Sequence, residues 1–171
     1  MKPEEPTHGG STAAEYFTDY LDFFRSSVVE SVTALPEAEH RTTRLPSGWT
    51  PIELLSHLLH MEERWFVWGF LGEQVEQPWG DWQDGEPGTH WSVDDHTTLP
   101  DLVDRLQAVG ERTRAILRET ALSTRGQVGE RFEGDPPDLQ WICFHVLQEY
   151  ARHAGHLDIA AELATPTEES R

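Results

Sequence analysis

Cysteine is almost absent from this chain, and its apolar stretches are short. One cysteine, Cys143, among 171 residues excludes an internal disulfide and a metal site made only of cysteines. No stretch approaches the roughly 18 consecutive apolar residues of a membrane-spanning helix. The polar first eleven residues also lack the apolar core of a secretory signal. These absences predict a cytoplasmic protein that does not enter a membrane.

Positive charge is scarce as well. The chain has one lysine, Lys2, and twelve scattered arginines against 31 acidic residues, which gives a formal net charge of −18 at pH 7. Nucleic-acid binding gains much of its free energy from lysine and arginine side chains at phosphates. Without a basic patch, the sequence predicts no binding to nucleic acid.

The length corresponds to one domain. Residues 1–11 are polar and contain proline and glycine, so we expect a flexible N-terminal segment there. Residues 12–165 are expected to form the domain, and residues 166–171 an acidic tail.

Four segments with apolar residues at three- and four-residue spacings predict helices. They cover about residues 12–35, 51–71, 98–120 and 135–164, and Ser11 is the expected N-cap of the first. The clearest start signal is Thr50-Pro51-Ile52-Glu53, with threonine at the N-cap, proline at the first helical position and glutamate at the third. Four long helices without a convincing strand predict an all-α four-helix bundle.

The last predicted helix carries polar side chains on the face that should pack against the other helices. A bundle helix buries such a stripe, and a buried carboxylate needs a compensating cation, proton or metal. The stripe consists of Ile142, His145, Glu149, His153, His156, Ala160 and Leu163.

A metal site would take donors from two helices. His57 is expected on the inward face of the helix at 51–71. Glu149 and His153 are four residues apart and can converge on one ion, whereas His145 and His153, about 12 Å apart along the axis, cannot. Two imidazoles and a carboxylate with an open position are typical of a catalytic zinc site, and Ni²⁺, Fe²⁺ or Mn²⁺ accepts the same donors. Spacing alone leaves pairings with His145 or His156 open.

The same residues also have a structural interpretation. An inward histidine is commonly a hydrogen-bonded core group, so the polar stripe is also compatible with a metal-free network. His60, His145 and His156 are expected to support the ligands or to belong to the core, and His153 with His156 is an alternative ligand pair.

Residues 73–97 form a long predicted loop that contains Trp79, Trp82 and Trp91. Three tryptophans argue against disorder, and long loops in compact domains are often functional. We expect these tryptophans either to line a substrate pocket or to cap one end of the helices. Cys143, beside the polar stripe, is expected to be an inert buried thiol.

Two stretches resemble the DinB/YfiT-like metalloproteins. Residues 48–66, which contain Gly-Trp-Thr-Pro, Leu-Ser-His-Leu and Glu-Glu-Arg-Trp-Phe, are similar to the second helix of that family. Residues 145–158, HVLQEYARHAGHLD, are similar to the last helix of a branch in which glutamate replaces the first histidine of a His-x-x-x-His pair. That branch is close to the metal-binding domain of mycothiol-dependent maleylpyruvate isomerase. The resemblance covers about residues 12–165.

The resemblance implies an up-down-down-up four-helix bundle, with a homodimer as a further expectation. It also implies a metal triad of His57, Glu149 and His153, and a low-molecular-weight thiol such as mycothiol or bacillithiol as co-substrate. The isomerase has a further C-terminal domain that contributes to its active site. Because this chain ends soon after the last predicted helix, we do not expect maleylpyruvate isomerisation.

Three hypotheses follow for the function. The first is a zinc-dependent thiol S-transferase, in which the open position of the ion holds a thiol as thiolate for attack on a small electrophilic molecule. The second is a metal-dependent hydrolase that activates water instead. The third is a non-enzymatic metal-binding bundle.

Overall fold

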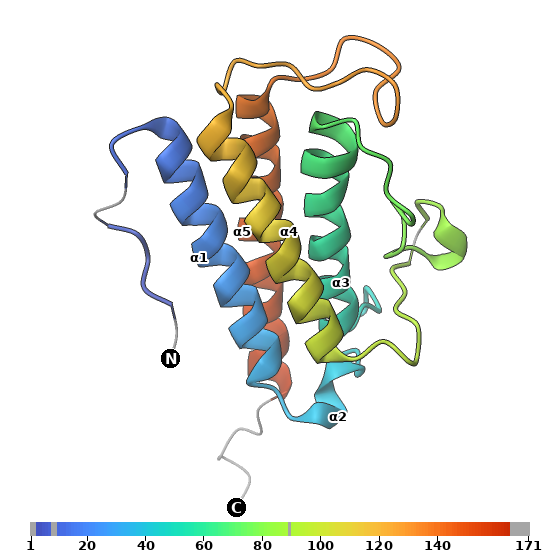
Figure 1. The fold of residues 1–171 in the computed structure, drawn as a ribbon. Coiled ribbons are helices and arrows are strands. Elements are labelled where there is room, and N and C mark those ends of the chain that lie inside the picture. Colours follow the sequence, from blue (N-terminus) through green and yellow to red (C-terminus); the bar gives the residue numbers. More distant parts are fainter. Residues whose placement is uncertain (1–2, 8–9, 89, 165–171) are drawn as a thin grey trace, which may run out of the picture.

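A computed structural model describes residues 3–7, 10–88 and 90–164, and these ranges are all-helical apart from their connections (Figure 1). The long helices are α1 (Ala13–Thr33), α3 (Pro51–Glu62), α4 (Leu99–Glu119) and α5 (Leu139–Ala164). Helix α3 continues into a π-helix, η1 (Glu63–Phe70), and two short helices, α2 (Glu37–His40) and η2 (Gln83–Gly85), lie in connections. Within the described ranges, strand-like pairing is limited to two isolated bridges, Trp82–Trp91 and Arg125–Asp138.

Capping boxes start three of the long helices. At α3 the Thr50 side chain accepts from the backbone of Glu53, and the Glu53 side chain accepts from the Thr50 N–H at 2.8 Å, as the sequence predicts. Helix α4 starts in the same way at Thr98. The expectation for Ser11 is wrong, because Thr12 caps α1. Each box satisfies backbone N–H groups that have no partner inside the helix.

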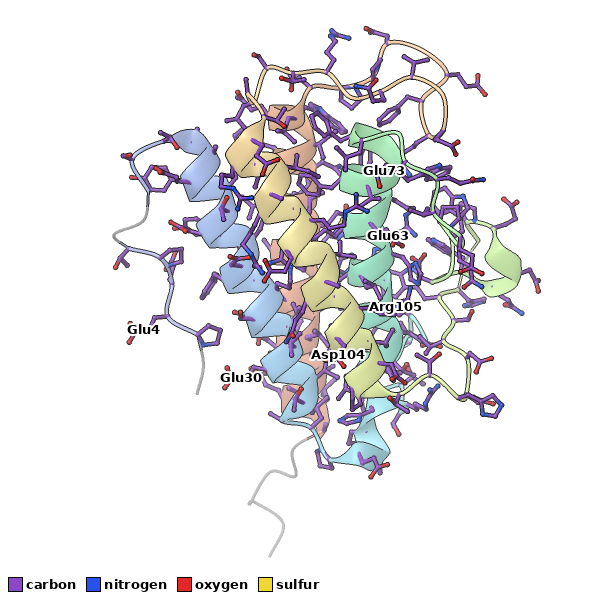
Figure 2. All side chains as sticks on the ribbon, in the orientation of Figure 1. Glu4, Glu30, Glu63, Glu73, Asp104 and Arg105 are labelled. Atoms are coloured by element: carbon purple, nitrogen blue, oxygen red, sulfur yellow. The ribbon has the colours of Figure 1, made fainter. Side chains whose placement is uncertain are left out.

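The long helices surround one apolar core. Helix α1 packs against α4 and α5, and α3 packs against the same two helices from the other side. In Figure 1, α1 and α5 run downward, whereas α3 and α4 run upward. Acidic side chains such as Glu4, Glu73 and Asp104 are exposed at the outside, in keeping with the net charge (Figure 2). Among the described residues, no helix is both long enough and apolar enough to cross a bilayer.

Helix α3 is enclosed on nearly every side. All its residues except Glu53 are buried, whereas the sequence predicts only a one-sided apolar stripe. The difference arises because the connection at 73–97 folds back over the side that the other helices leave open, where Asp81 and Trp91 contact His57. A helix that is covered all round is buried all round.

The face of α5 that packs against the core is rotated about the helix axis relative to the stripe predicted from the sequence. His145, Glu149 and His156 lie at its margin, and Leu163 is 51% exposed. The rotation puts the polar side chains beside the core instead of in its centre, where a carboxylate would cost most. The buried face of α5 consists of Leu139, Ile142, Cys143, Val146, Tyr150, His153, Leu157 and Ala160.

A buried ionic network, which the sequence does not predict, joins all four long helices. Glu62 on α3 is completely buried, and its carboxylate accepts hydrogen bonds from Arg25 on α1 at 2.7 and 3.2 Å. Thr113 on α4 and Tyr150 on α5 donate to the same carboxylate. A buried carboxylate with this many donors and one cation is fully compensated.

One of the predicted helices needs a small correction, and some of the predicted terminal segments lie outside the described residues. The helix expected at 51–71 is confirmed as far as Phe70, but its last eight residues are π-helical. The predicted acidic tail at 166–171 lies outside the described residues, as do residues 1, 2, 8 and 9 of the expected flexible segment.

Candidate metal centre

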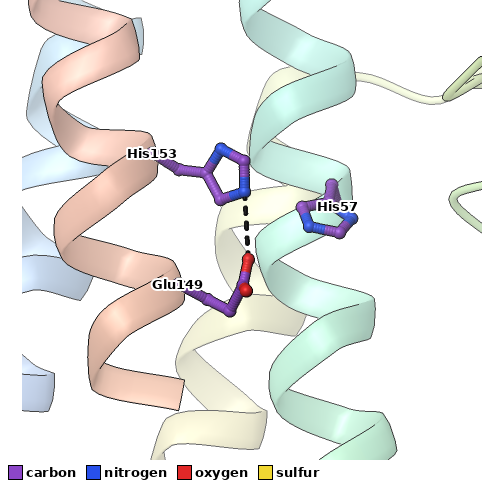
Figure 3. Close-up of side chains that lie close together, drawn as sticks. All are labelled: His57, Glu149 and His153. Carbon is purple, nitrogen blue, oxygen red and sulfur yellow. Dashed lines mark hydrogen bonds and ion pairs between the residues drawn. The ribbon is translucent and has the colours of Figure 1, made fainter. Parts of the chain in front are cut away.

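Two helices bring three potential metal donors together (Figure 3). His57 comes from the middle of α3, and Glu149 and His153 come from successive turns of α5. One ligand atom from each lies within 4.8 Å of the other two. Nε2 of His153 is 3.2 Å from Oε2 of Glu149, and the rings of His57 and His153 are 5.0 Å apart. The three donors are therefore near enough to one another to share a single ion.

The electrostatics of this group suit a cation. Burial lowers the pKa of His57 below its usual value, and the hydrogen bond from His153 lowers the pKa of Glu149. The imidazole of His57 is therefore neutral and the carboxylate of Glu149 is ionised at neutral pH, which are the forms that coordinate metals. The donor set of two imidazoles and one carboxylate fits a divalent metal with a further position open.

Asp81 supports His57 from the connection at 73–97. Its Oδ2 lies 2.9 Å from Nδ1 of His57, and Arg64 donates two hydrogen bonds to the same carboxylate. Burial alone would raise the pKa of Asp81, but the hydrogen bonds from His57 and Arg64 hold it below the usual value. The His57 ring therefore donates from Nδ1 and has Nε2 free for an ion, an arrangement typical of metal-binding histidines.

Asp81 does not emerge from the sequence reasoning. Its position among the loop tryptophans is a weak signal, because helical periodicity cannot show which loop residue meets a helix.

The other histidines on α5 lie beside the donor group. Nδ1 of His156 is 3.3 Å from Nδ1 of His153, the nitrogen opposite the one that faces Glu149. His145 stacks on Trp141, with ring centroids 5.2 Å apart and planes within 7°. Neither histidine belongs to the group within 4.8 Å, which consists of His57, Glu149 and His153.

His60 is buried behind the connection, on the side of α3 that Gly80 covers. It is 2% exposed, and burial lowers its pKa to about 4. Its ring packs so closely against Gly80 that a Cβ there would lie 2.6 Å from Cε1 of His60. Within the described part of the chain, its Nδ1 has no hydrogen-bond partner. His60 therefore supports the backbone that carries Asp81.

Two of the three predicted tryptophans lie at the donor group. Trp91 stacks on His57 at 4.2 Å, and the Trp82 ring lies 6.4 Å from His57. Both line a cavity of about 430 Å³ together with Trp49, which the sequence analysis did not single out as a pocket residue. Trp79 instead contacts Arg64 and lines a neighbouring cavity of about 380 Å³.

Cys143 is a free, buried thiol on α5. Burial raises its pKa to about 12, so the reactive thiolate is scarce at neutral pH.

An all-helical domain that gathers two histidines and a glutamate from two of its helices has the features of the DinB/YfiT-like proteins. The chain matches the family model for mycothiol-S-transferase over residues 16–166 and belongs to that family. This match confirms the resemblance seen in the sequence. A search of curated proteins and a search of solved structures each found no match.

Proposed function

We propose that this chain is a metal-dependent thiol S-transferase that uses mycothiol and holds Zn²⁺ at His57, Glu149 and His153. The observation that carries the proposal is the convergence of these three donors within 4.8 Å in a chain of the mycothiol-S-transferase family. The zinc identity rests on the chemistry of the donors, and Ni²⁺, Fe²⁺ or Mn²⁺ are alternatives.

The proposal includes the architecture that serves this site. Residues 12–165 act as one domain, an up-down-down-up four-helix bundle, which the helix directions in Figure 1 support. A cytoplasmic location suits a reduced thiol co-substrate. The exposed side chains of Phe144 and Ile159 on α5 are compatible with a homodimer.

The reaction forms a sulfur–carbon bond and breaks both the S–H bond of the thiol and the bond between the carbon and its leaving group. The thiol sulfur of the co-substrate bonds to an electrophilic carbon, the leaving group departs with its electron pair, and the thiol proton is released to solvent or to a base. A bound divalent cation supplies positive charge that favours the deprotonated form of the thiol. Asp81 fixes the orientation of His57, and Arg64 fixes Asp81.

The adjoining cavity has the properties of a small-molecule site. Its volume of about 430 Å³ is in the usual range for ligand pockets, and its walls contain tryptophans, as the walls of such pockets commonly do. Trp82 lines it, and the buried Nε1–H of Trp82 has no acceptor among the described residues.

Metal content tests the proposal directly. We expect about one zinc per chain in the purified protein by mass spectrometry, and loss of the metal in His57→Ala, Glu149→Ala and His153→Ala. The exposed His96→Ala is the matched control and should keep its metal. Stoichiometric metal in any of the three variants would refute the triad.

A turnover assay then separates the reaction classes. Conjugation of mycothiol to an electrophile by the zinc-loaded protein, and its loss in His153→Ala, would support the transferase. Equal turnover with and without thiol would indicate a hydrolase instead. Full metal occupancy without any turnover would favour a non-enzymatic bundle.

A further inference from the structure

Arg131 has no carboxylate partner among the described residues and lies over tryptophan rings of η1 and of the connection that follows it. Cζ of Arg131 is 4.2 Å from the ring centroid of Trp65, 5.6 Å from that of Trp68 and 5.7 Å from that of Trp79. Gly69 allows this approach, since a Cβ there would lie 3.0 Å from Cδ of Arg131. Cation–π contacts with three tryptophans hold the guanidinium in a defined place.

The described part of the chain offers Arg131 no hydrogen bond or ion pair, and its Nη1 is buried without a partner. The nearest comparison is Arg64, which contacts the same Trp79 ring but is neutralised by Asp81. The carboxylate next to Arg131 in sequence, Glu130, accepts from Trp68 instead. The chain has 31 acidic residues, so the lack of an acidic partner for Arg131 is a specific feature of its position.

Arg131 remains a cation at neutral pH. Burial and the nearby charge of Arg64 lower its pKa to about 10, which still leaves it protonated. Partial desolvation of a cation without a counter-ion is unfavourable in free energy. An anion that pairs with the cation offsets this free energy. A planar guanidinium pairs best with a carboxylate, through two parallel hydrogen bonds.

A continuous set of side chains leads from Arg131 to the candidate metal centre. The Trp65 ring under Arg131 also contacts His145 at 4.3 Å, and His145 lies one turn before Glu149 on α5. Trp141, 50% exposed, stacks on His145 and contacts Trp65 at 5.4 Å. Apolar ring surface therefore separates the guanidinium from the metal donors.

We propose that Arg131, Trp65, Trp141 and His145 form a subsite for an organic carboxylate with an aromatic or other apolar body. Arg131 pairs with the carboxylate, and the three rings contact the apolar part. The inference rests on the proposed function in one respect, because it assigns this anion to the electrophilic co-substrate. The net charge of −18 repels anions at long range, so recognition depends on these local contacts.

The test compares an acid with its neutral amide on the zinc-loaded full chain. Binding of 3-phenylpropionate and 3-phenylpropanamide is measured by calorimetry. We expect the acid to bind at least about tenfold tighter, since a charge-assisted pair contributes that much. Arg131→Gln should remove this preference and keep its zinc. Arg125→Gln, in the same connection but paired with Asp135, is the matched control and should keep the preference.

Several results would overturn the subsite. Equal binding of acid and amide to the wild-type chain would do so, as would a preference that survives in Arg131→Gln. A preference that survives in Arg131→Gln but disappears in zinc-free His153→Ala would place the carboxylate on the metal instead. If Arg131→Gln does not fold, Arg131→Lys replaces it, and unweakened acid binding there would count against the planar pair.

The binding test is independent of turnover. Failure to conjugate mycothiol, with the acid preference intact, would refute the transferase and leave the subsite standing. Conjugation of mycothiol without any preference for the acid would refute the subsite and leave the transferase standing.

Discussion

Nδ1 of His57 and Oδ2 of Asp81 are 2.9 Å apart although 24 residues separate them in the chain. This hydrogen bond joins the middle of α3 to the connection at 73–97, which also supplies Trp82 and Trp91 to the cavity. The residue that orients the proposed metal donor His57 and two tryptophans that line the cavity thus belong to one segment. In the proposed metal centre, we therefore expect metal binding and the shape of the cavity to be coupled through Asp81.

Asp81→Asn should weaken zinc binding by about 10- to 100-fold, because the amide is a poorer acceptor for the Nδ1–H of His57 and no longer neutralises Arg64. Competition against a chromophoric chelator measures the change. Asp95→Asn, an exposed carboxylate in the same connection, should bind zinc like the wild type. Equal affinities for the two variants would show that the Asp81 hydrogen bond does not affect the metal.

Gly80→Ala should lower the free energy of unfolding by about 1–3 kcal/mol, because its Cβ would lie 2.6 Å from the buried ring of His60. The shift needed to relieve this clash also moves Asp81, so zinc affinity should fall. Urea denaturation and zinc titration measure the two effects. The matched control is Gly88→Ala, whose Cβ meets no atom closer than 3.9 Å. A Gly80→Ala protein as stable as that control would contradict the contact.

His60 should make the protein less stable in acid. Its pKa is about 4 in the folded chain and about 6.5 when unfolded, so between these pH values the unfolded chain binds a proton that the folded chain does not. The contribution of neutral His60 to the free energy of unfolding is fully present above pH 6.5 and is lost as the pH falls towards 4. At pH 5 the loss is about 2 kcal/mol. Urea denaturation at pH 7 and pH 5 should show a smaller acid loss in His60→Gln than in the wild type. The same loss in both proteins would rule out His60 as its source.

Glu62→Leu should destabilise the fold by about 3 kcal/mol, because it leaves Arg25 buried without its main counter-ion. This expected loss of stability is at the low end of the range for breaking a buried ion pair, because Asp22 still contacts Arg25. Adding Arg25→Met removes the unpaired charge, so the double variant should be more stable than Glu62→Leu. Guanidinium denaturation of the four chains of this cycle gives the coupling energy, and simple additivity would contradict the network.

Cys143 should not react with a thiol reagent such as iodoacetamide in the native protein, because burial raises its pKa to about 12 and shields the sulfur. Alkylation should proceed in urea, and mass spectrometry follows both reactions. Rapid modification of the folded chain would show that α5 opens near Cys143. An inert Cys143 also means that any thiol consumed in turnover assays comes from the co-substrate.

Local patterns predicted most of the helices. The capping box at Thr50 acts within four residues and needs no tertiary context, so the start of α3 is correct to the residue. Helical spacing made His57, Glu149 and His153 candidate donors but left pairings with His145 or His156 open, and the family resemblance selected the three that the structure brings within 4.8 Å.

Tertiary contacts account for what the sequence did not predict. Asp81 lies in an irregular connection, where no periodicity indicates which side chain turns inward. Glu62 and Arg25 look like surface charges until four helices bury them together. The rotation of α5 follows from packing, because a polar stripe beside Val146 and Tyr150 is cheaper at the margin of the core than in its centre.

The π-helix η1 also has a consequence for insertions and deletions. The N–H of Leu71 bonds to the carbonyl of Phe66, five residues back, so this segment holds more chain per turn than an α-helix. Removing one residue between 63 and 70 would favour an ordinary α-helix and so change the spacing of the side chains on η1. The positions of the Trp65 and Trp68 rings under Arg131 depend on that spacing. Residues 83–88 are exposed, so we expect changes of length there to disturb the structure less than changes of length in η1.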